Sequence, residues 1–167
     1  MQTDDRRQSE FLEMLRQHEG FLLKVCLVFG GRGREDFKDL YQEIALNLWE
    51  SWKFFRGESD PGTWVVRIAL NVAGQELRRR KNRPQFVEFD ERFYDLLADE
   101  ATDERYHRLY DLIDRLGDDE RKLLFLYLDR KSLREIAAIT GGTEVGVKQK
   151  IHRIKKKLST LKQQEDE

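Results

Sequence analysis

Apolar side chains recur with the period of an α-helix through residues 37–52, and this pattern constrains the fold more than any other feature of the sequence. They stand at the spacings i, i+3, i+4, i+7, i+8, i+11, i+12 and i+15, at Phe37, Leu40, Tyr41, Ile44, Ala45, Leu48, Trp49 and Trp52. A stripe of this kind covers one side of a helix and is buried against other elements. The sequence therefore predicts a long helix packed within a helical bundle.

Helical patterns flank this stripe on both sides. From Ser9 to Phe29 the apolar spacing predicts one amphipathic helix, which ends in a flexible turn at the glycine-rich residues 30–33. After the stripe, Asp60 is expected to cap a third helix with Pro61 at its first position, because proline lacks the amide hydrogen that this position leaves unpaired. We expect this third helix to end near Arg80.

The third helix carries two different faces. Its apolar stripe consists of Trp64, Val65, Ile68, Ala69, Val72, Ala73 and Leu77, and a polar row follows at Arg67, Asn71, Gln75 and Arg78. The polar row leads into a basic run that includes Arg79, so residues 67–83 have a net charge of +5. With the aromatic residues Trp52, Phe54 and Phe55 before it, this row together with Arg79 suits contact with single-stranded nucleic acid, which needs cations and stacking surfaces. A solvated helix face with a packed Trp64 is the alternative.

The charge reverses after Pro84. Residues 85–104 contain eight acidic side chains and one basic side chain, with aromatic residues between them. We interpret this segment as an acidic tether, or alternatively as a short amphipathic helix from Glu91 to Ala98. The expected organisation is all-α: a three-helix domain at residues 1–84, an acidic linker at 85–104 and a second helical domain at 105–167.

The second domain has the pattern of a helix-turn-helix. Tyr106, Leu109, Ile113 and Leu116 have helical spacing, and Asp118 or Asp119 is then expected to cap a dense apolar helix at Leu123 to Leu128. Ser132 and Glu135 then form a capping box, Gly141 and Gly142 permit a sharp turn through their freedom at positive φ, and Thr143 can cap the last helix. That helix buries one apolar side, formed by Val147, Ile151, Ile154, Leu158 and Leu161, and residues 143–162 have a net charge of +6.

In a helix-turn-helix the second helix enters the DNA major groove. Residues able to contact phosphates or base edges stand on the last helix at Lys148, Gln149, His152, Arg153 and Lys156. The sequence thus predicts a second nucleic-acid surface, with a merely solvated basic face as the alternative.

Composition argues against several other functions. The 31 basic and 32 acidic residues leave a net charge of −1, whereas a free-standing DNA-binding protein is usually strongly basic. No carboxylate pair, nucleophile with a base or phosphate-binding loop stands out, so we expect no enzyme, no cofactor and no metal. The lone Cys26 is expected in the core. Without a signal peptide or membrane span, a cytoplasmic location is expected.

Three stretches of the sequence, two in the first domain and one in the second, resemble a known family. Residues 39–49, DLYQEIALNLW, and 63–73, TWVVRIALNVA, with the arginine run after them, resemble the second conserved region of extracytoplasmic-function (ECF) sigma factors of bacterial RNA polymerase. Residues 116–158, from LGDDER through EIA to VKQKIHRIKKKL, resemble their fourth region. The resemblance covers most of the chain in the same order.

The resemblance implies a role in promoter recognition, promoter melting and transcription initiation. It implies that Asp39, Gln42, Glu43 and Leu46 bind the clamp coiled coil of core RNA polymerase. It also implies that residues 55–60 hold a base flipped from the minus-ten element and that the polar row of the third helix lines this DNA. The last helix would read the minus-thirty-five element of promoter DNA, and an anti-sigma factor is a further candidate partner.

Two other functions remain open at this point. The chain could be a one-lobe regulator that binds palindromic DNA as a dimer through residues 132–161 and senses a ligand or partner with its first hundred residues. It could instead be a helical protein that sequesters a partner.

Overall fold

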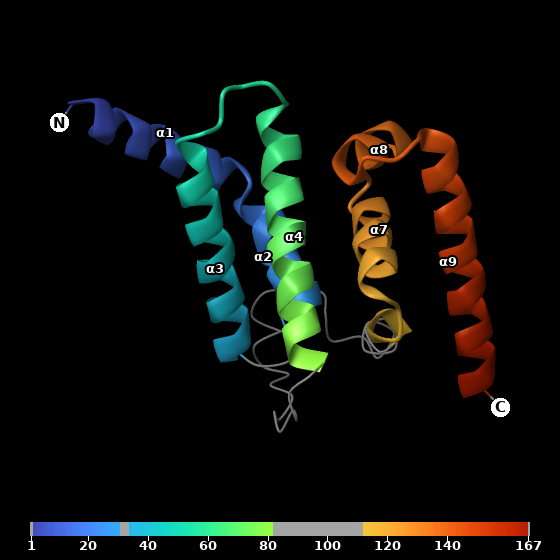
Figure 1. Ribbon diagram of the computed structural model, residues 1–167. Coiled ribbons are helices and arrows are strands. Elements are labelled where there is room, and N and C mark those ends of the chain that lie inside the picture. The colour runs from blue at the N-terminus through green and yellow to red at the C-terminus, as the bar shows by residue number, and fades with distance from the viewer. Residues whose placement is uncertain (1, 31–33, 82–111, 167) are drawn as a thin grey trace. The chain divides into compact units, whose positions relative to one another are not determined.

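The structure, a computed structural model, describes residues 2–30, 34–81 and 112–166. The chain forms two compact units, Met1–Asp90 and Glu91–Glu167. Within the described ranges every regular element is a helix, and there is no strand (Figure 1). The predicted all-α fold with two small helical domains is confirmed.

Among its described residues, the first unit contains four helices. They are α1 (Gln2–Gln17), α2 (Glu19–Phe29), α3 (Arg34–Trp52) and α4 (Pro61–Lys81), and α4 packs against both α2 and α3 (Figure 1). The core contains Leu22, Val25, Cys26, Phe29, Phe37, Leu40, Ile44, Leu48, Val65, Val66, Ala69, Leu70, Val72, Ala73 and Leu77. Val66 and Leu70 extend the buried face of α4 beyond the predicted stripe, because the helix has packing partners on two sides.

The single helix predicted from Ser9 to Phe29 is wrong, because the chain changes direction at His18. The His18 amide donates to the carbonyl of Leu15 at 3.3 Å, and its Nδ1 lies 2.9 Å from the carbonyl oxygen of Met14. The break gives α1 and α2 different directions. Phe11 of α1 then lies with its ring centroid 4.9 Å from that of Trp49, at the end of α3.

Helix α4 begins as predicted. The Thr63 amide donates to Oδ2 of Asp60 at 3.0 Å, and Pro61 is the first helical residue. Because Asp60 directly follows the loop after α3, this cap fixes where the loop joins the helix.

The second unit contains α7 (Asp118–Leu128), α8 (Leu133–Thr140) and α9 (Glu144–Glu165). Its core includes Leu116, Leu123, Leu124, Leu126, Ile136, Ile139, Val147, Ile151 and Ile154. On α9 the predicted apolar side is buried at Val147, Ile151 and Ile154, whereas Leu158 and Leu161 are half-buried.

The turns of the second unit confirm most of the predicted caps. Oγ of Ser132 accepts from the Glu135 amide at 3.1 Å, and the Glu135 carboxylate accepts from the Ser132 amide at 2.8 Å. Gly141 has a φ of 77°, and Oγ1 of Thr143 accepts from the Gly146 amide at 3.1 Å. The cap predicted at Asp118 or Asp119 is wrong: Gly117 holds that position, and its amide donates to Glu120 at 3.0 Å.

Several predicted features lie outside the described residues. They are the acidic tether at 85–104, the alternative helix from Glu91 to Ala98 and most of the helix expected at 106–116. The limits of the two domains therefore stay predictions.

Candidate nucleic-acid and protein interfaces

A polar row on α4 is exposed in the first unit. All four predicted side chains, Arg67, Asn71, Gln75 and Arg78, are exposed. At 100° per residue these positions fall within about 80° of one another around the helix. Arg78 Nε donates back to the carbonyl of Gly74 at 3.3 Å. The helix thus presents two cations and two amides along one line, which we call the α4 row.

The loop between α3 and α4 is held by an aromatic cluster. The rings of Trp52 and Phe55 stack at 5.5 Å with an angle of 14°, and Phe55 lies 4.9 Å from Trp64. Phe54 is different, because it is 72% exposed, with Nζ of Lys53 5.1 Å from its ring centroid. The sequence places Trp52, Phe54 and Phe55 in one aromatic stretch and Trp64 in the apolar stripe of the third helix. In the structure Trp52, Phe55 and Trp64 pack against one another, whereas Phe54 faces solvent.

The predicted contact residues on α9 are also exposed. This set, the α9 row, consists of Lys148, Gln149, His152, Arg153 and Lys156. Two other cations of α9 contact α7 instead: Lys155 donates to the hydroxyl of Tyr127 at 2.8 Å, and Lys157 lies 2.9 Å from Glu120. Lys155 and Lys157 are thus exposed cations that also contact α7, and the sequence did not distinguish them from the other cations of α9.

One side of α3 presents the residues predicted to bind polymerase. Asp39, Gln42 and Leu46 are exposed and Glu43 is half-buried, and their spacing of i, i+3, i+4 and i+7 places them on one side of the helix. We call this set the α3 face. Leu46 is 56% exposed. Farther along the helix Trp49, a member of the predicted apolar stripe, is 41% exposed.

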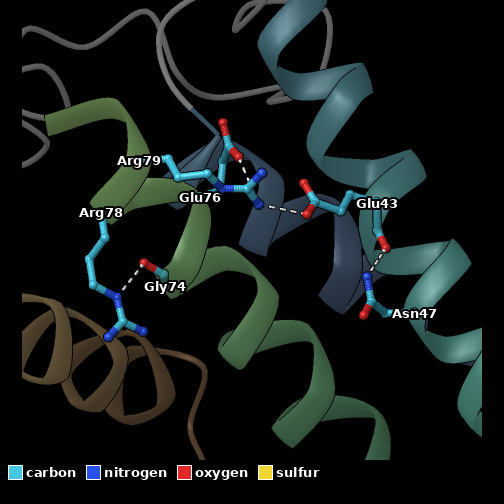
Figure 2. Close-up of polar contacts among 6 residues, drawn as sticks. All are labelled: Glu43, Asn47, Gly74, Glu76, Arg78 and Arg79. Carbon is cyan, nitrogen blue, oxygen red and sulfur yellow. Dashed lines mark hydrogen bonds and ion pairs between the residues drawn. The ribbon is translucent and has the colours of Figure 1, made fainter. Parts of the chain in front are cut away.

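Arg79 lies between α3 and α4, away from Arg78 (Figure 2). Its Nη2 lies 2.6 Å from Oε1 of Glu43 and 3.4 Å from Oε2 of Glu76. The hydrogen bond that Arg79 donates to Glu43 and the negative charge of that carboxylate raise the pKa of Arg79. The position of Arg79 in the basic run predicts a DNA contact. Sequence spacing gives no sign of the Glu43–Arg79 pair.

Comparison with known proteins finds a matching family for each unit. Residues 14–83 match the family of Sigma-70 region 2 domains, and residues 106–158 match that of Sigma-70 region 4 domains. The RNA polymerase sigma-H factor of Pseudomonas aeruginosa is 29% identical over 139 residues, which cover 75% of this chain and 70% of that protein. The ECF RNA polymerase sigma factor SigX of Bacillus subtilis is 27% identical over 132 residues, covering 73% and 68%.

Two solved structures share the fold. The complex of CnrH with the cytosolic domain of CnrY matches with a TM-score of 0.67 and 22% identity, over 92% of this chain and 88% of that chain. The sigma factor RpoE in complex with the anti-sigma factor NepR from Bartonella quintana matches with a TM-score of 0.65 and 18% identity, over 93% and 96%. At these identities the likeness concerns the fold.

The two helical units, in this order, define the class of bacterial RNA polymerase sigma factors. Within that class, the chain belongs to the ECF sigma factors of the sigma-70 family. It is thus a transcription initiation factor, in a family whose members are not enzymes.

No helix among the described residues is long and apolar enough to cross a membrane. In the same ranges, no group of three or more His, Cys, Asp or Glu side chains is placed to hold a metal ion.

Proposed function

We propose that this sigma factor binds core RNA polymerase and promoter DNA through the α3 face, the α4 row and the α9 row. Residues 1–84 would bind the core enzyme and the minus-ten element, and residues 105–167 the minus-thirty-five element. Residues 85–104 would link the two. The observation that carries the proposal is that each unit presents an exposed row of cations and amides opposite its packed core.

The α3 face suits a protein partner. It combines an exposed leucine with the carboxylates of Asp39 and Glu43 and the amide of Gln42. Burial of Leu46 in a complex would favour binding, while the polar groups would set its orientation. We assign this face to the clamp coiled coil of the core enzyme.

The α4 row and the loop before it suit a separated DNA strand. Arg67 and Arg78 supply positive charge for phosphates, and Asn71 and Gln75 can hydrogen-bond to base edges. The aromatic cluster would hold residues 55–60 in place, and the exposed Phe54 offers a ring for stacking. This surface would capture a flipped base of the minus-ten element and so favour the melted promoter.

The α9 row suits duplex DNA. Helix α9 begins directly after the Gly141 turn, as the second helix of a helix-turn-helix does. Gln149, His152 and Arg153 are able to read base edges, and Lys148 and Lys156 to bind phosphates.

The chain itself would make and break no bond and would need no cofactor. Its binding free energy would shift the promoter from the closed to the melted state, while the polymerase performs the chemistry. With a net charge of −1, the isolated chain should bind DNA weakly. Its place of action would be the cytoplasm, where polymerase and promoters are found. An anti-sigma factor would be a regulatory partner, as NepR is for RpoE in the structurally similar complex.

The direct test is to mix the purified chain with core RNA polymerase and a promoter library, and to measure complex formation and initiation. The double variant Lys148→Ala/Arg153→Ala should weaken promoter binding by the holoenzyme about tenfold or more and reduce its dependence on salt. Lys157→Ala is the matched control, because this lysine is paired with Glu120. Failure to bind the core enzyme, together with dimers on palindromic DNA, would instead identify a one-lobe regulator.

A further inference from the structure

The Glu43–Arg79 pair joins the surfaces that the proposed function assigns to polymerase and to DNA. Glu43 belongs to the α3 face, and Arg79 stands one residue after the last member of the α4 row. The two side chains come from different helices and meet at 2.6 Å (Figure 2). Either Arg79 is a DNA contact that Glu43 partly neutralises, or it serves the polymerase side.

Charge around Arg79 argues against a DNA contact. Two carboxylates, those of Glu43 and Glu76, lie within 3.4 Å of Nη2 of this one guanidinium. These three side chains together have a net charge of −1, which disfavours an approaching phosphate. Arg78 lies 100° farther back around the helix and points away from both carboxylates (Figure 2). Of the two arginines, Arg78 is therefore the one suited to DNA.

The same geometry gives Arg79 a role toward Glu43. A glutamate on a helix surface samples several rotamers, and a charge-assisted hydrogen bond restricts them. The pair involves Oε1, and a carboxylate has a second oxygen that also accepts hydrogen bonds. Glu43 is thus held in one orientation while it keeps an acceptor for a partner.

We propose that Arg79 is a positioning residue for polymerase binding: it orients the Glu43 carboxylate on the α3 face for a hydrogen-bond donor of the core enzyme. This inference rests on the proposed function of the α3 face. It assigns Arg79 to the protein interface and leaves Arg67, Asn71, Gln75 and Arg78 for DNA.

The test is a double-mutant cycle on the full chain, with the Kd for core RNA polymerase as the readout. Arg79→Ala should weaken core binding about three- to fivefold, the range expected for a partly exposed ion pair. In the Glu43→Ala background the same change should have almost no further effect, because Arg79 acts through Glu43. Additive effects of the two changes would overturn the proposal. Arg79→Gln repeats the measurement with an uncharged side chain that is longer than alanine and whose helix propensity is close to that of arginine.

Promoter binding at saturating core enzyme provides the second readout. Arg79→Ala should leave the slope of log affinity against log salt unchanged, whereas Arg78→Ala should reduce it by about one. If Arg79→Ala reduces this slope and leaves core affinity intact, Arg79 is a DNA contact and the inference is wrong. Measurement of the wild type distinguishes failure of this inference from failure of the proposed function. If the wild type does not bind the core enzyme, the proposed function is wrong, and this inference with it.

Discussion

At the scale of single residues, burial makes two side chains behave unlike their exposed counterparts. Cys26 lies in the core of the first unit, and burial raises the pKa of its thiol to about 12. Arg121 is 3% exposed in the second unit, and its buried Nε has no hydrogen-bond partner among the described residues. Burial lowers the pKa of this arginine, and the carboxylates of Asp114 and Asp118 oppose that shift. Both residues give predictions that depend on burial.

Stability should fall with rising pH through Cys26. The folded thiol stays protonated up to about pH 12, while the unfolded thiol ionises from about pH 9. The free energy of unfolding should therefore decrease across this window, by at most about 1.4 kcal/mol per pH unit from this group. Urea unfolding of wild type and Cys26→Ala at pH 8 and pH 10 measures this effect. The free energy of unfolding of Cys26→Ala minus that of wild type should be larger at pH 10 than at pH 8. An unchanged difference would contradict the raised pKa of the Cys26 thiol.

Arg121 should tolerate an apolar replacement better than a truncation. Its Nη2 donates to the carbonyl of Asp114 at 3.1 Å, and its Nη1 lies 3.4 Å from the Asp114 carboxylate. Arg121→Ala should cost about 2–4 kcal/mol, because it leaves a cavity and an unpaired carbonyl. Arg121→Met fills the space and removes the unsatisfied Nε, so its cost should stay below about 1.5 kcal/mol. Urea unfolding followed by circular dichroism compares them, and equal losses would refute the packing argument.

At the scale of elements, the turn between α8 and α9 depends on backbone conformation. Gly141 has a φ of 77°, which side chains other than glycine adopt at a cost. Neighbouring Gly142 has no positive φ, and a Cβ added there would come no closer than 3.8 Å to another group. Two adjacent glycines therefore have different reasons to be present.

Gly141→Ala should destabilise the second unit by about 1 kcal/mol, whereas Gly142→Ala should be neutral within about 0.5 kcal/mol. The first change forces a left-handed conformation on alanine, and the second does not. Thermal unfolding of the two variants, monitored by circular dichroism, tests this directly. A larger loss for Gly142→Ala would show that the turn is maintained by something other than the φ of Gly141.

At the scale of the whole molecule, each of the two units has a core of its own. All three tryptophans, Trp49, Trp52 and Trp64, are in the first unit. Fluorescence at tryptophan wavelengths therefore reports on the first unit, while circular dichroism reports on the helices of both.

We expect Arg121→Ala to lower the midpoint of the circular dichroism transition and to leave the tryptophan fluorescence transition within about 2 °C of wild type. The reason is that each unit has a core of its own, so a substitution in the second core leaves the core around the tryptophans intact. Differential scanning calorimetry provides the check. If both signals moved together in the variant, the two units would unfold as one cooperative body.

Local sequence patterns predicted most of the described helices and several of their starts. Helical spacing over residues 37–52, the Asp60 cap and the Ser132–Glu135 capping box are local features, because each depends on residues within one or two turns. The exposed positions of the α4 and α9 rows followed from the same periodicity. Local pattern failed at His18, where one helix ends and another begins, and at Gly117, which takes the cap position and donates its amide to Glu120.

The contacts between polar side chains of different helices can be seen only in the tertiary structure. Glu43 and Arg79 are separated by 36 positions, and Lys157 and Glu120 by 37, so no periodic pattern connects them. The same holds for the aromatic cluster that brings Trp52 beside Trp64. Helix formation depends on short-range spacing, whereas the division of a charged surface into paired and exposed groups depends on how helices distant in sequence pack together.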